Sequence, residues 1–188
     1  PGRKILISGG GRCNFTNLHV APDRYLSANP HFAKSALARY TPRDFVSLID
    51  RYGIAWHEKT LGQLFCDGSA RQVVDLLLAE CGKGGVDVRC GLPTTQVRHA
   101  DGRFFVATAT GEVSAPRLVV ATGGPSIPRM GATGFAYDLA RQFGLKVVQP
   151  RPALVPLTLG GDDVLFRELS GVALDVVASA GKARFREA

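Results

Sequence analysis

The sequence predicts an α/β fold over residues 1–152, followed by the beginning of a β-rich part in residues 153–188. Two apolar runs, at residues 4–7 and 118–121, each lead into consecutive glycines, as strands do when they end in a ligand-binding loop. Between these runs, apolar residues recur first with a helical period and then with a period of two. Helices and strands therefore follow one another within one domain.

Four segments have the apolar spacing and the boundary residues of helices. The best defined begins at Thr41, which is a suitable N-cap, continues with Pro42 in the first helical position and Asp44 in the first turn, and ends at Gly53. The other three occupy residues 31–40, 69–82 and 133–143. Each ends in a polar or glycine-containing segment.

Three short strands with polar turns between them are predicted at residues 95–99, 103–109 and 112–115. Asp101-Gly102 and Thr110-Gly111 stand where tight turns are needed, so the segment predicts a β-meander. The meander leads into the apolar run at 118–121, and a further strand is predicted at 146–149.

Pro150 and Pro152 predict a domain boundary, because proline favours an extended link and interrupts helices and central strands. After it, the segments 154–159 and 172–180 have apolar residues at every second position. We expect them to open a β-rich second domain that contributes one wall of the substrate site.

The glycine-rich segment between Ser8 and Asn17 is the most informative part of the chain. Gly9, Gly10 and Gly11 allow a backbone with positive φ and a close approach to a ligand, and Arg12 adds a planar cation suited to phosphate. Three glycines alone are also compatible with a simple turn. The segment ends in Arg-Cys-Asn-Phe-Thr-Asn rather than in the Lys-Ser/Thr of a P-loop.

Together with three other blocks, this segment resembles the YhiN-type, aminoacetone-oxidase-like family of NAD(P)/FAD-dependent oxidoreductases. Gly2-Arg3-Lys4 matches the lead-in before the glycine run, and Thr122-Gly123-Gly124 matches the end of the apolar run at 118–121. The blocks at residues 131–137 and 152–157 follow in the family's order. The resemblance covers most of the chain.

The resemblance implies an incomplete Rossmann-like FAD-binding domain of the glutathione-reductase type, with the meander crossing one face of a parallel sheet. The runs at 4–7 and 118–121 would then be neighbouring strands whose carboxyl ends share one crevice. The fingerprint G-x-G-x-x-G, which the family carries on a preceding βα unit, is absent from these residues. We therefore interpret the chain as an internal fragment and expect it to bind FAD weakly or not at all by itself, or to be inactive alone.

The resemblance also implies which residues bind the cofactor. Arg3 and Lys4 would lie near the diphosphate or ribose, and residues 8–14 would lie along the flavin ring and ribityl chain through backbone N–H groups. Val97 would contact the edge of the adenine, and the Thr-Gly-Gly block would approach the adenosine half. The complete set is Arg3, Lys4, Ser8, Gly9, Gly10, Gly11, Arg12, Cys13, Asn14, Val97, Ala121, Thr122, Gly123, Gly124 and Gly134.

The function implied by the resemblance is redox chemistry at a bound FAD, with NAD(P)H as the electron donor. A small molecule is the first substrate class, through oxidation of an amine or reduction of a C=C bond. The second is RNA, through reduction of a pyrimidine ring. The net charge of +7 suits an anionic ligand. FAD, NAD(P)H and RNA are all anions, so the charge is compatible with the cofactors and with an RNA substrate.

The sequence identifies no catalytic acid or base. We interpret His57, Glu58 and Lys59 as an exposed polar surface. The four cysteines lack the spacing of a zinc site and are expected to be free thiols, so we expect no metal. No apolar run is long enough to span a bilayer, and we expect a cytoplasmic protein without a membrane partner.

Overall fold

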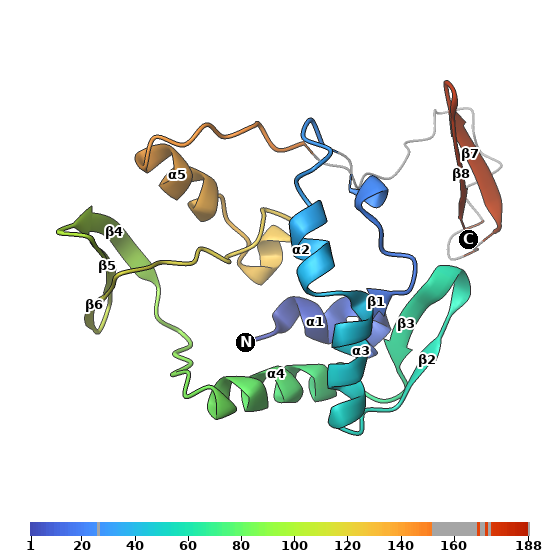
Figure 1. The fold of residues 1–188 in the computed structure, drawn as a ribbon, viewed down its shortest axis with the longest axis horizontal. Helices are drawn as coiled ribbons and strands as arrows, with labels where there is room; N and C mark the ends of the chain where they lie inside the picture. The colour runs from blue at the N-terminus through green and yellow to red at the C-terminus, as the bar shows by residue number, and fades with distance from the viewer. Residues whose placement is uncertain (26, 152–168, 170–171, 173, 188) are drawn as a thin grey trace. The chain divides into compact units, whose positions relative to one another are not determined.

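The computed structural model describes residues 1–25, 27–151, 169, 172 and 174–187 (Figure 1). These residues form two compact units, Pro1–Lys146 and Val147–Ala188. The helices of the first unit are α1 (Arg3–Ile7), α2 (Lys34–Arg39), α3 (Pro42–Arg51), α4 (Arg71–Lys83) and α5 (Phe135–Gln142). Its strands are β1 (Asn14–Asn17), β2 (Trp56–Glu58), β3 (Gln63–Cys66), β4 (Thr94–Ala100), β5 (Arg103–Thr108) and β6 (Gly111–Ala115). Short 3-10 turns are η1 (Ser8–Gly11), η2 (Pro22–Arg24), η3 (Thr60–Gly62) and η4 (Pro128–Met130).

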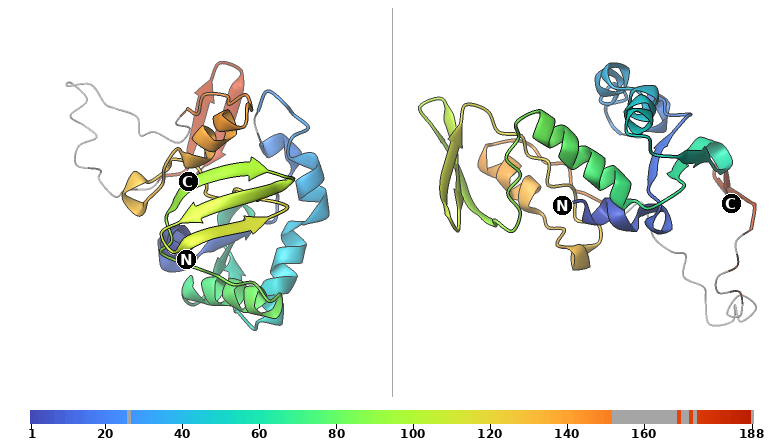
Figure 2. Two further views of the ribbon diagram at one scale, coloured as in Figure 1. Left: turned by 90° about the vertical axis from the view of Figure 1, so that its left-hand side faces the viewer. Right: turned by 90° about the horizontal axis from the view of Figure 1, so that it is seen from below.

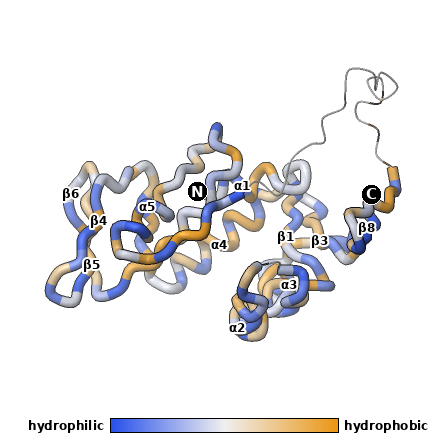
Figure 3. Tube along the Cα trace, turned by 90° about the horizontal axis from the view of Figure 1, so that it is seen from above, coloured by the Kyte–Doolittle hydropathy of each residue, from blue (hydrophilic) through white to orange (hydrophobic). Residues whose placement is uncertain are grey.

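The main hydrophobic core lies where α3, α4 and the small sheet β1–β3–β2 meet. Ile49, Leu64 and Cys66 are completely buried, and Val73 and Leu76 of α4 are nearly so. Aromatic residues close its edge: the Phe15 ring meets Phe45 and Trp56 edge-on. The α3 helix carries both hydrophobic and hydrophilic residues, whose colours are mixed along its tube in Figure 3, and its Leu48 and Ile49 are buried in this core.

The predicted helix at residues 41–53 is confirmed, with its start as the sequence indicates. Thr41 is the N-cap of α3, and its side chain accepts a hydrogen bond from the backbone N–H of Asp44. The Asp44 carboxylate accepts in return from the backbone N–H of Thr41 at 2.7 Å, which completes a capping box. These bonds from Thr41 hold the pKa of Asp44 below its ordinary value. The other three predicted helices appear as α2, α4 and α5, with shorter bounds.

The predicted meander is also confirmed. The strands β4, β5 and β6 form one antiparallel sheet in that order, as the left view of Figure 2 shows. Asp101 and Gly102 both have positive φ in the first turn. Gln142 at the end of α5 donates a 2.6 Å hydrogen bond to the carbonyl of Val97, and Phe143 meets Phe104 edge-on, so α5 is fastened to this sheet.

The strand predicted at residues 4–7 is wrong, because this segment forms α1. The N–H of Leu6 donates to the carbonyl of Gly2 at 3.0 Å, a helical bond. Gly2 itself has a φ of +72°, and a Cβ there would lie 2.6 Å from Val74, so α1 packs closely on α4. A run of only three apolar residues, Ile5 to Ile7, fits a strand or a helix equally well, and periodicity cannot separate them.

The strands predicted at 118–121 and 146–149 do not form either. Neither segment has a ladder partner among the described residues, and the side chain of Val119 is 85% exposed. The parallel sheet with neighbouring strands at 4–7 and 118–121 is therefore absent from the part of the chain that is described. All strand pairs there are antiparallel. A strand exists only where a partner satisfies its N–H and C=O groups, which a sequence run alone does not supply.

The second unit contains one described hairpin, β7 (Val176–Ala180) paired with β8 (Ala183–Glu187). The predicted strand character of 172–180 is confirmed over Val176–Ala180. The segment 154–159 lies outside the described residues. That this unit begins a substrate domain stays a prediction. In the described residues, no helix has the length and apolar character to cross a membrane.

Candidate functional site

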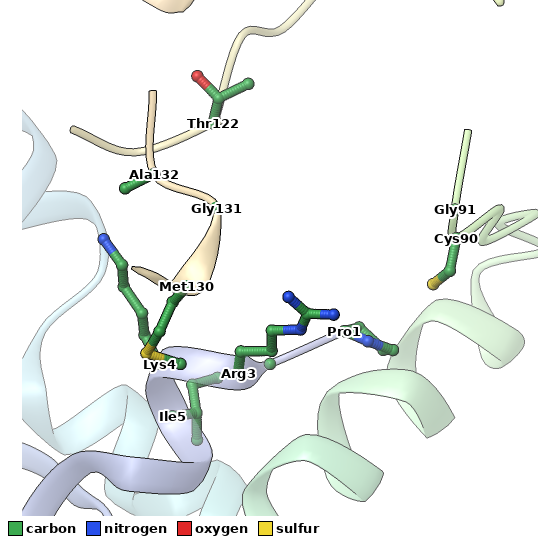
Figure 4. Close-up of a pocket in the computed structure, with 11 residues that line it drawn as sticks. Pro1, Arg3, Lys4, Ile5, Cys90, Gly91, Thr122, Met130, Gly131 and Ala132 are labelled. Carbon is green, nitrogen blue, oxygen red and sulfur yellow. The ribbon is translucent and has the colours of Figure 1, made fainter. Parts of the chain in front are cut away.

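The predicted cofactor site contains a pocket of about 540 Å³ within the first unit. Arg3 and Lys4 of α1 line it on one side, and Thr122 and Gly131 line it on another. Figure 4 shows the Arg3 guanidinium extending from α1 into the space between the Met130–Gly131 turn and Cys90. The Arg3 guanidinium, the Thr122 side chain and the Gly131 backbone therefore border one space, which suits a phosphate-bearing ligand, while the Nζ of Lys4 is directed away from Arg3.

One hydrogen bond connects the two glycine-containing regions that the sequence singles out. The Nζ of Lys4 donates to the Oγ of Ser126 at 3.0 Å, between residues 122 positions apart. Ser126 lies two residues after the Thr-Gly-Gly block, so Lys4 connects α1 with the segment that follows that block. This bond joins the start of the run at 4–7 to the segment after the Thr-Gly-Gly block, but the predicted crevice at the carboxyl ends of two neighbouring strands does not form, because neither run is a strand.

The loop at Ser8–Arg12 turns the chain sharply between α1 and β1. Gly9, Gly10 and Gly11 have φ values of +57°, +65° and +88°. A Cβ on Gly9 would lie 2.6 Å from the Phe65 ring and 2.8 Å from the backbone nitrogen of Asn14, so only glycine fits there. At Gly10 there is open space, and the requirement for glycine comes from the backbone alone.

Backbone hydrogen bonds fix this loop against the core. The N–H of Cys66 donates to the carbonyl of Arg12 at 3.1 Å, and the N–H of Ala70 donates to the carbonyl of Gly11 at 2.7 Å. The N–H of Cys13 donates inside the loop to Ser8 at 3.0 Å, and that of Arg12 donates to Gly9 at 3.3 Å. The loop is therefore held rigidly, and these two N–H groups already have partners.

The remaining predicted site residues are not among those that line this pocket. Ser8 donates its hydroxyl to the carbonyl of Ile5, and Arg12 is exposed. The Asn14 side-chain amide is assigned the orientation in which its nitrogen faces two backbone carbonyls. In this orientation it donates to the carbonyls of Leu64 and Thr16, which orders the start of β1. Val97 is buried in the meander, and its carbonyl bonds to Gln142.

The glycines around the Thr-Gly-Gly block also differ in environment. Gly123 has a φ of +73° and faces open space, next to the exposed Ala121. A Cβ on Gly124 would contact the hydroxyl of Tyr137 at 3.4 Å, and Gly134 is the N-cap of α5. Of the predicted residues, only Arg3, Lys4 and Thr122 line the pocket together.

The sequence missed several residues of the pocket. They are Pro1, Gly2, Ile5, Cys90, Gly91, Met130 and Ala132, whereas Gly131, which also lines the pocket, stands in a block that matches the family. Met130 ends η4, and the positive φ of Gly131 caps that turn. No local pattern marks Cys90 and Gly91, because tertiary folding alone brings them near α1.

Two of the cysteines are buried beside the glycine-rich loop. Cys13 has a φ of +56°, and Cys66 pairs with Trp56 across β2 and β3. Burial raises the pKa of the Cys66 thiol from 9.0 to about 11, with smaller contributions from Cys13 and Asp67. Cys66 therefore stays protonated at neutral pH and serves as a packing residue. In the described part of the chain, no three His, Cys, Asp or Glu side chains gather as metal ligands do.

Comparison with known proteins relates this chain to one family. A curated relative from Escherichia coli (strain K12), named ribosomal RNA dihydrouridine synthase, is 54% identical over 183 residues, which is 96% of this chain and 45% of the relative. A protein of the same name from Haemophilus influenzae is 50% identical over 95% of this chain and 46% of its own length.

A more distant relative from Clostridium scindens is named 3-dehydro-bile acid delta(4,6)-reductase, and it is 29% identical over 95% of this chain and 43% of the relative. All three relatives carry the names of enzymes, and the chain spans less than half of the length of each. The model of the HI0933-like protein Rossmann domain matches residues 1–181. The chain therefore belongs to the HI0933-like Rossmann domain family.

Proposed function

We propose that this chain is the part of a flavin-dependent reductase that holds FAD, and that the substrate is a pyrimidine ring of ribosomal RNA. The single observation that carries the cofactor part is the pocket that Arg3, Lys4, Thr122 and Gly131 line. The RNA part is supported by the relatives at 54% and 50% identity and by the net charge of +7.

The residues of the pocket fit the diphosphate of FAD. Arg3 and Lys4 supply the charge that a diphosphate requires, and Thr122 supplies a hydroxyl donor. Gly131, with a φ of +88° and open space at its missing Cβ, leaves the backbone accessible to a ligand. When bound, FAD would supply hydride transfer from NAD(P)H to the substrate, while these side chains bind and orient it.

The relatives support one type of reaction. A dihydrouridine synthase and a delta(4,6)-reductase both act, by their names, where two hydrogens are added across a C=C bond. The same chemistry on a uracil ring gives dihydrouridine. We therefore favour reduction of a C=C bond over oxidation of an amine as the reaction.

A bacterial complementation experiment tests this function. The gene encoding the natural protein would be expressed in an Escherichia coli strain that lacks its own ribosomal RNA dihydrouridine synthase. We expect dihydrouridine to reappear in digested ribosomal RNA, measured by mass spectrometry. The purified protein should also show the visible absorption of a bound flavin that NAD(P)H bleaches. RNA without dihydrouridine, despite a soluble and flavin-loaded protein, would overturn the substrate.

A small apolar substrate is the second candidate. One observation favours it: an apolar pocket of about 520 Å³ between α5 and the segment 118–120, lined by Phe104, Tyr137, Phe143 and Leu145 among others. The relative named as a bile acid reductase is consistent with such a ligand. Steady-state reduction of a conjugated steroid ketone by the purified protein, with transcribed ribosomal RNA in parallel, separates the two substrates.

A further inference from the structure

A third pocket, a polar groove, lies in the segment that leads from β1 to α2 (Figure 1). Its volume is about 380 Å³, which is within the range of pockets that hold small ligands. The groove is lined by Pro22, Asp23, Tyr25, Ser27, Pro30 and Lys34. None of these residues lines the pocket at Arg3 or the apolar pocket at α5. The groove is therefore a separate site, built from one continuous stretch of the chain.

Local hydrogen bonds give this stretch a defined backbone. The N–H of Tyr25 donates to the carbonyl of Pro22 at 3.2 Å, which closes the turn η2. The hydroxyl of Ser27 donates to the carbonyl of Asn29 at 2.8 Å and accepts from the N–H of Asn29 at 3.0 Å. The side-chain oxygen of Asn29 then accepts from the N–H of His31 at 3.0 Å. The walls of the groove are thus set before a ligand arrives.

Tyr25 gives the groove a flat aromatic surface. Its side chain is 50% exposed, and no other aromatic ring packs against it in the part of the chain that is described. Pro22 and Pro30 line the same space with apolar rings. An accessible aromatic side chain is the surface on which an unpaired nucleobase stacks.

The groove also contains one charge of each sign. Asp23 offers carboxylate oxygens that accept hydrogen bonds, and Lys34 offers an ammonium group that donates them. Neither side chain forms an ion pair with a described residue, so both remain available to a ligand. A nucleotide matches this pair, because its base carries N–H donors and its phosphate is an anion. An inorganic anion alone would be repelled by Asp23.

The surroundings of the groove favour a nucleic acid over a free nucleotide. Within residues 18–40, Arg24, Lys34 and Arg39 outnumber the one carboxylate, and all three cations are exposed. The Phe32 side chain, which is 80% exposed, offers a second aromatic surface in the same segment. Exposed cations that alternate with aromatic rings are typical of surfaces that bind single-stranded RNA, whose bases are free to unstack.

We propose that this groove binds an unstacked nucleotide of a single-stranded region of the RNA substrate. Tyr25 stacks on the base, Asp23 accepts a hydrogen bond from an N–H group of the base edge, and Lys34 contacts a neighbouring phosphate. This inference rests on the function proposed above, in which RNA is the substrate. It assigns RNA binding to the groove and no part in hydride or proton transfer.

Replacement of Tyr25 tests the stacking in the purified, flavin-loaded natural protein. The probe is a fluorescein-labelled oligouridylate of about 12 nucleotides, and fluorescence anisotropy gives its dissociation constant. In Tyr25→Ala, we expect the affinity to fall roughly 5- to 100-fold, the usual effect of losing one stacked base. Tyr25→Phe is the matched control, because it keeps the ring and should bind nearly as tightly as the wild type. Equal affinities for wild type and Tyr25→Ala would overturn the stacking role.

Replacement of Lys34 separates a specific phosphate contact from the effect of net charge. In Lys34→Gln, the slope of the logarithm of the binding constant against the logarithm of the salt concentration should become less steep by about 0.7, the value for one phosphate of a single strand. Lys146→Gln removes the same charge at an exposed position outside the groove and should keep the wild-type slope. Equal slopes for Lys34→Gln and Lys146→Gln would overturn the phosphate contact.

Competition tests whether the groove requires an unstacked base. Unlabelled oligouridylate should displace the probe from the wild type much better than an adenylate–uridylate duplex of the same length, because a duplex keeps its bases stacked and paired. Equal displacement by the two would overturn the single-stranded part of the proposal. Flavin absorption and thermal unfolding check the fold of each variant, and Lys34→Gln, at an exposed position, keeps the test decisive if Tyr25→Ala does not fold.

The outcomes distinguish this inference from the function on which it rests. Binding is measured without turnover, so the titrations decide the role of the groove even if the complementation experiment yields no dihydrouridine and the proposed function fails. If the wild type forms dihydrouridine and both groove variants bind the probe as the wild type does, only the inference is overturned. A wild type that does not bind the probe would also overturn it.

Discussion

Lys4 and Ser126 are joined by a 3.0 Å hydrogen bond between Nζ and Oγ, although 122 positions of the chain separate them. Lys4 lies on α1 just before the glycine-rich loop, and Ser126 lies just after the Thr-Gly-Gly block. Lys4 also lines the pocket at Arg3. The bond leaves the charge of Lys4 available to a ligand there, because a serine hydroxyl does not neutralise an ammonium group.

Removal of this charge should weaken cofactor binding. For Lys4→Met in the natural protein, we expect the dissociation constant for FAD to rise about tenfold, since a hydrogen bond to a charged group contributes roughly 1.5–3 kcal/mol. The measurement is a fluorescence titration of apoprotein with FAD. Lys146→Met, which changes an exposed lysine away from the pocket, is the control. Equal affinities for FAD in the wild type, Lys4→Met and Lys146→Met would show that Lys4 serves only the contact with Ser126.

The three glycines of the loop should differ in their tolerance of alanine. Gly10→Ala should lower stability by about 1–2 kcal/mol, because its φ of +65° disfavours any Cβ. Gly9→Ala should cost more, because the added Cβ also meets the Phe65 ring and the Asn14 backbone.

Thermal unfolding of both variants measures this difference. Gly53→Ala is the control for Gly10→Ala, since Gly53 has nearly the same φ of +64° and open space but ends α3 far along the chain from the loop. Flavin content should fall in the loop variants and not in Gly53→Ala. Greater loss of stability in Gly10→Ala than in Gly9→Ala would contradict the packing of the loop on Phe65.

The Cys66 thiol should make stability fall at alkaline pH. Its pKa is raised to about 11 by burial, whereas an unperturbed thiol has a value of 9.0. The folded state thus keeps a proton that the unfolded state loses, so this contribution is complete below pH 9 and disappears as the pH rises towards 11.

Denaturant unfolding between pH 8 and pH 11, with Cys66→Ala beside the wild type, measures this. The free energy of unfolding should decline less with rising pH in Cys66→Ala than in the wild type. Native alkylation gives a second readout at neutral pH: iodoacetamide should modify the exposed Cys90 much faster than Cys66. Rapid alkylation of Cys66 would mean that the loop opens readily.

The capping box of α3 should contribute measurably to stability. Thr41→Ala removes the acceptor for the Asp44 N–H and should lower the free energy of unfolding by about 1 kcal/mol. Ser47→Ala, an exposed position within the same helix, is the matched control and should change little.

This contribution should depend on acid pH in a defined direction. The bonds from Thr41 lower the pKa of Asp44 in the folded state, so its stabilising effect is present above pH 3.8 and is lost as the pH falls through the lowered value. The difference between wild type and Thr41→Ala should therefore shrink in acid. A constant difference from neutral to acid pH would show that the Asp44 carboxylate takes no part.

Local sequence signals were sufficient for the helices α2 to α5 and for the meander, but not for α1. Thr41, Pro42 and Asp44 predict the start of α3, and Asp101-Gly102 predicts the first turn of the meander, because caps and tight turns depend on residues close in the chain. The positive φ values of Gly9–Gly11 were likewise indicated by residue type.

Only the tertiary structure decided whether the apolar runs at 4–7 and 118–121 are strands. A strand needs a neighbour to pair its backbone, and the former run satisfies its own N–H and C=O groups as α1, while the latter has no partner among the described residues. The same holds for the site. The family resemblance suggested Arg3, Lys4 and Thr122, but Cys90 reaches the same pocket only because the folded chain brings distant positions within contact distance.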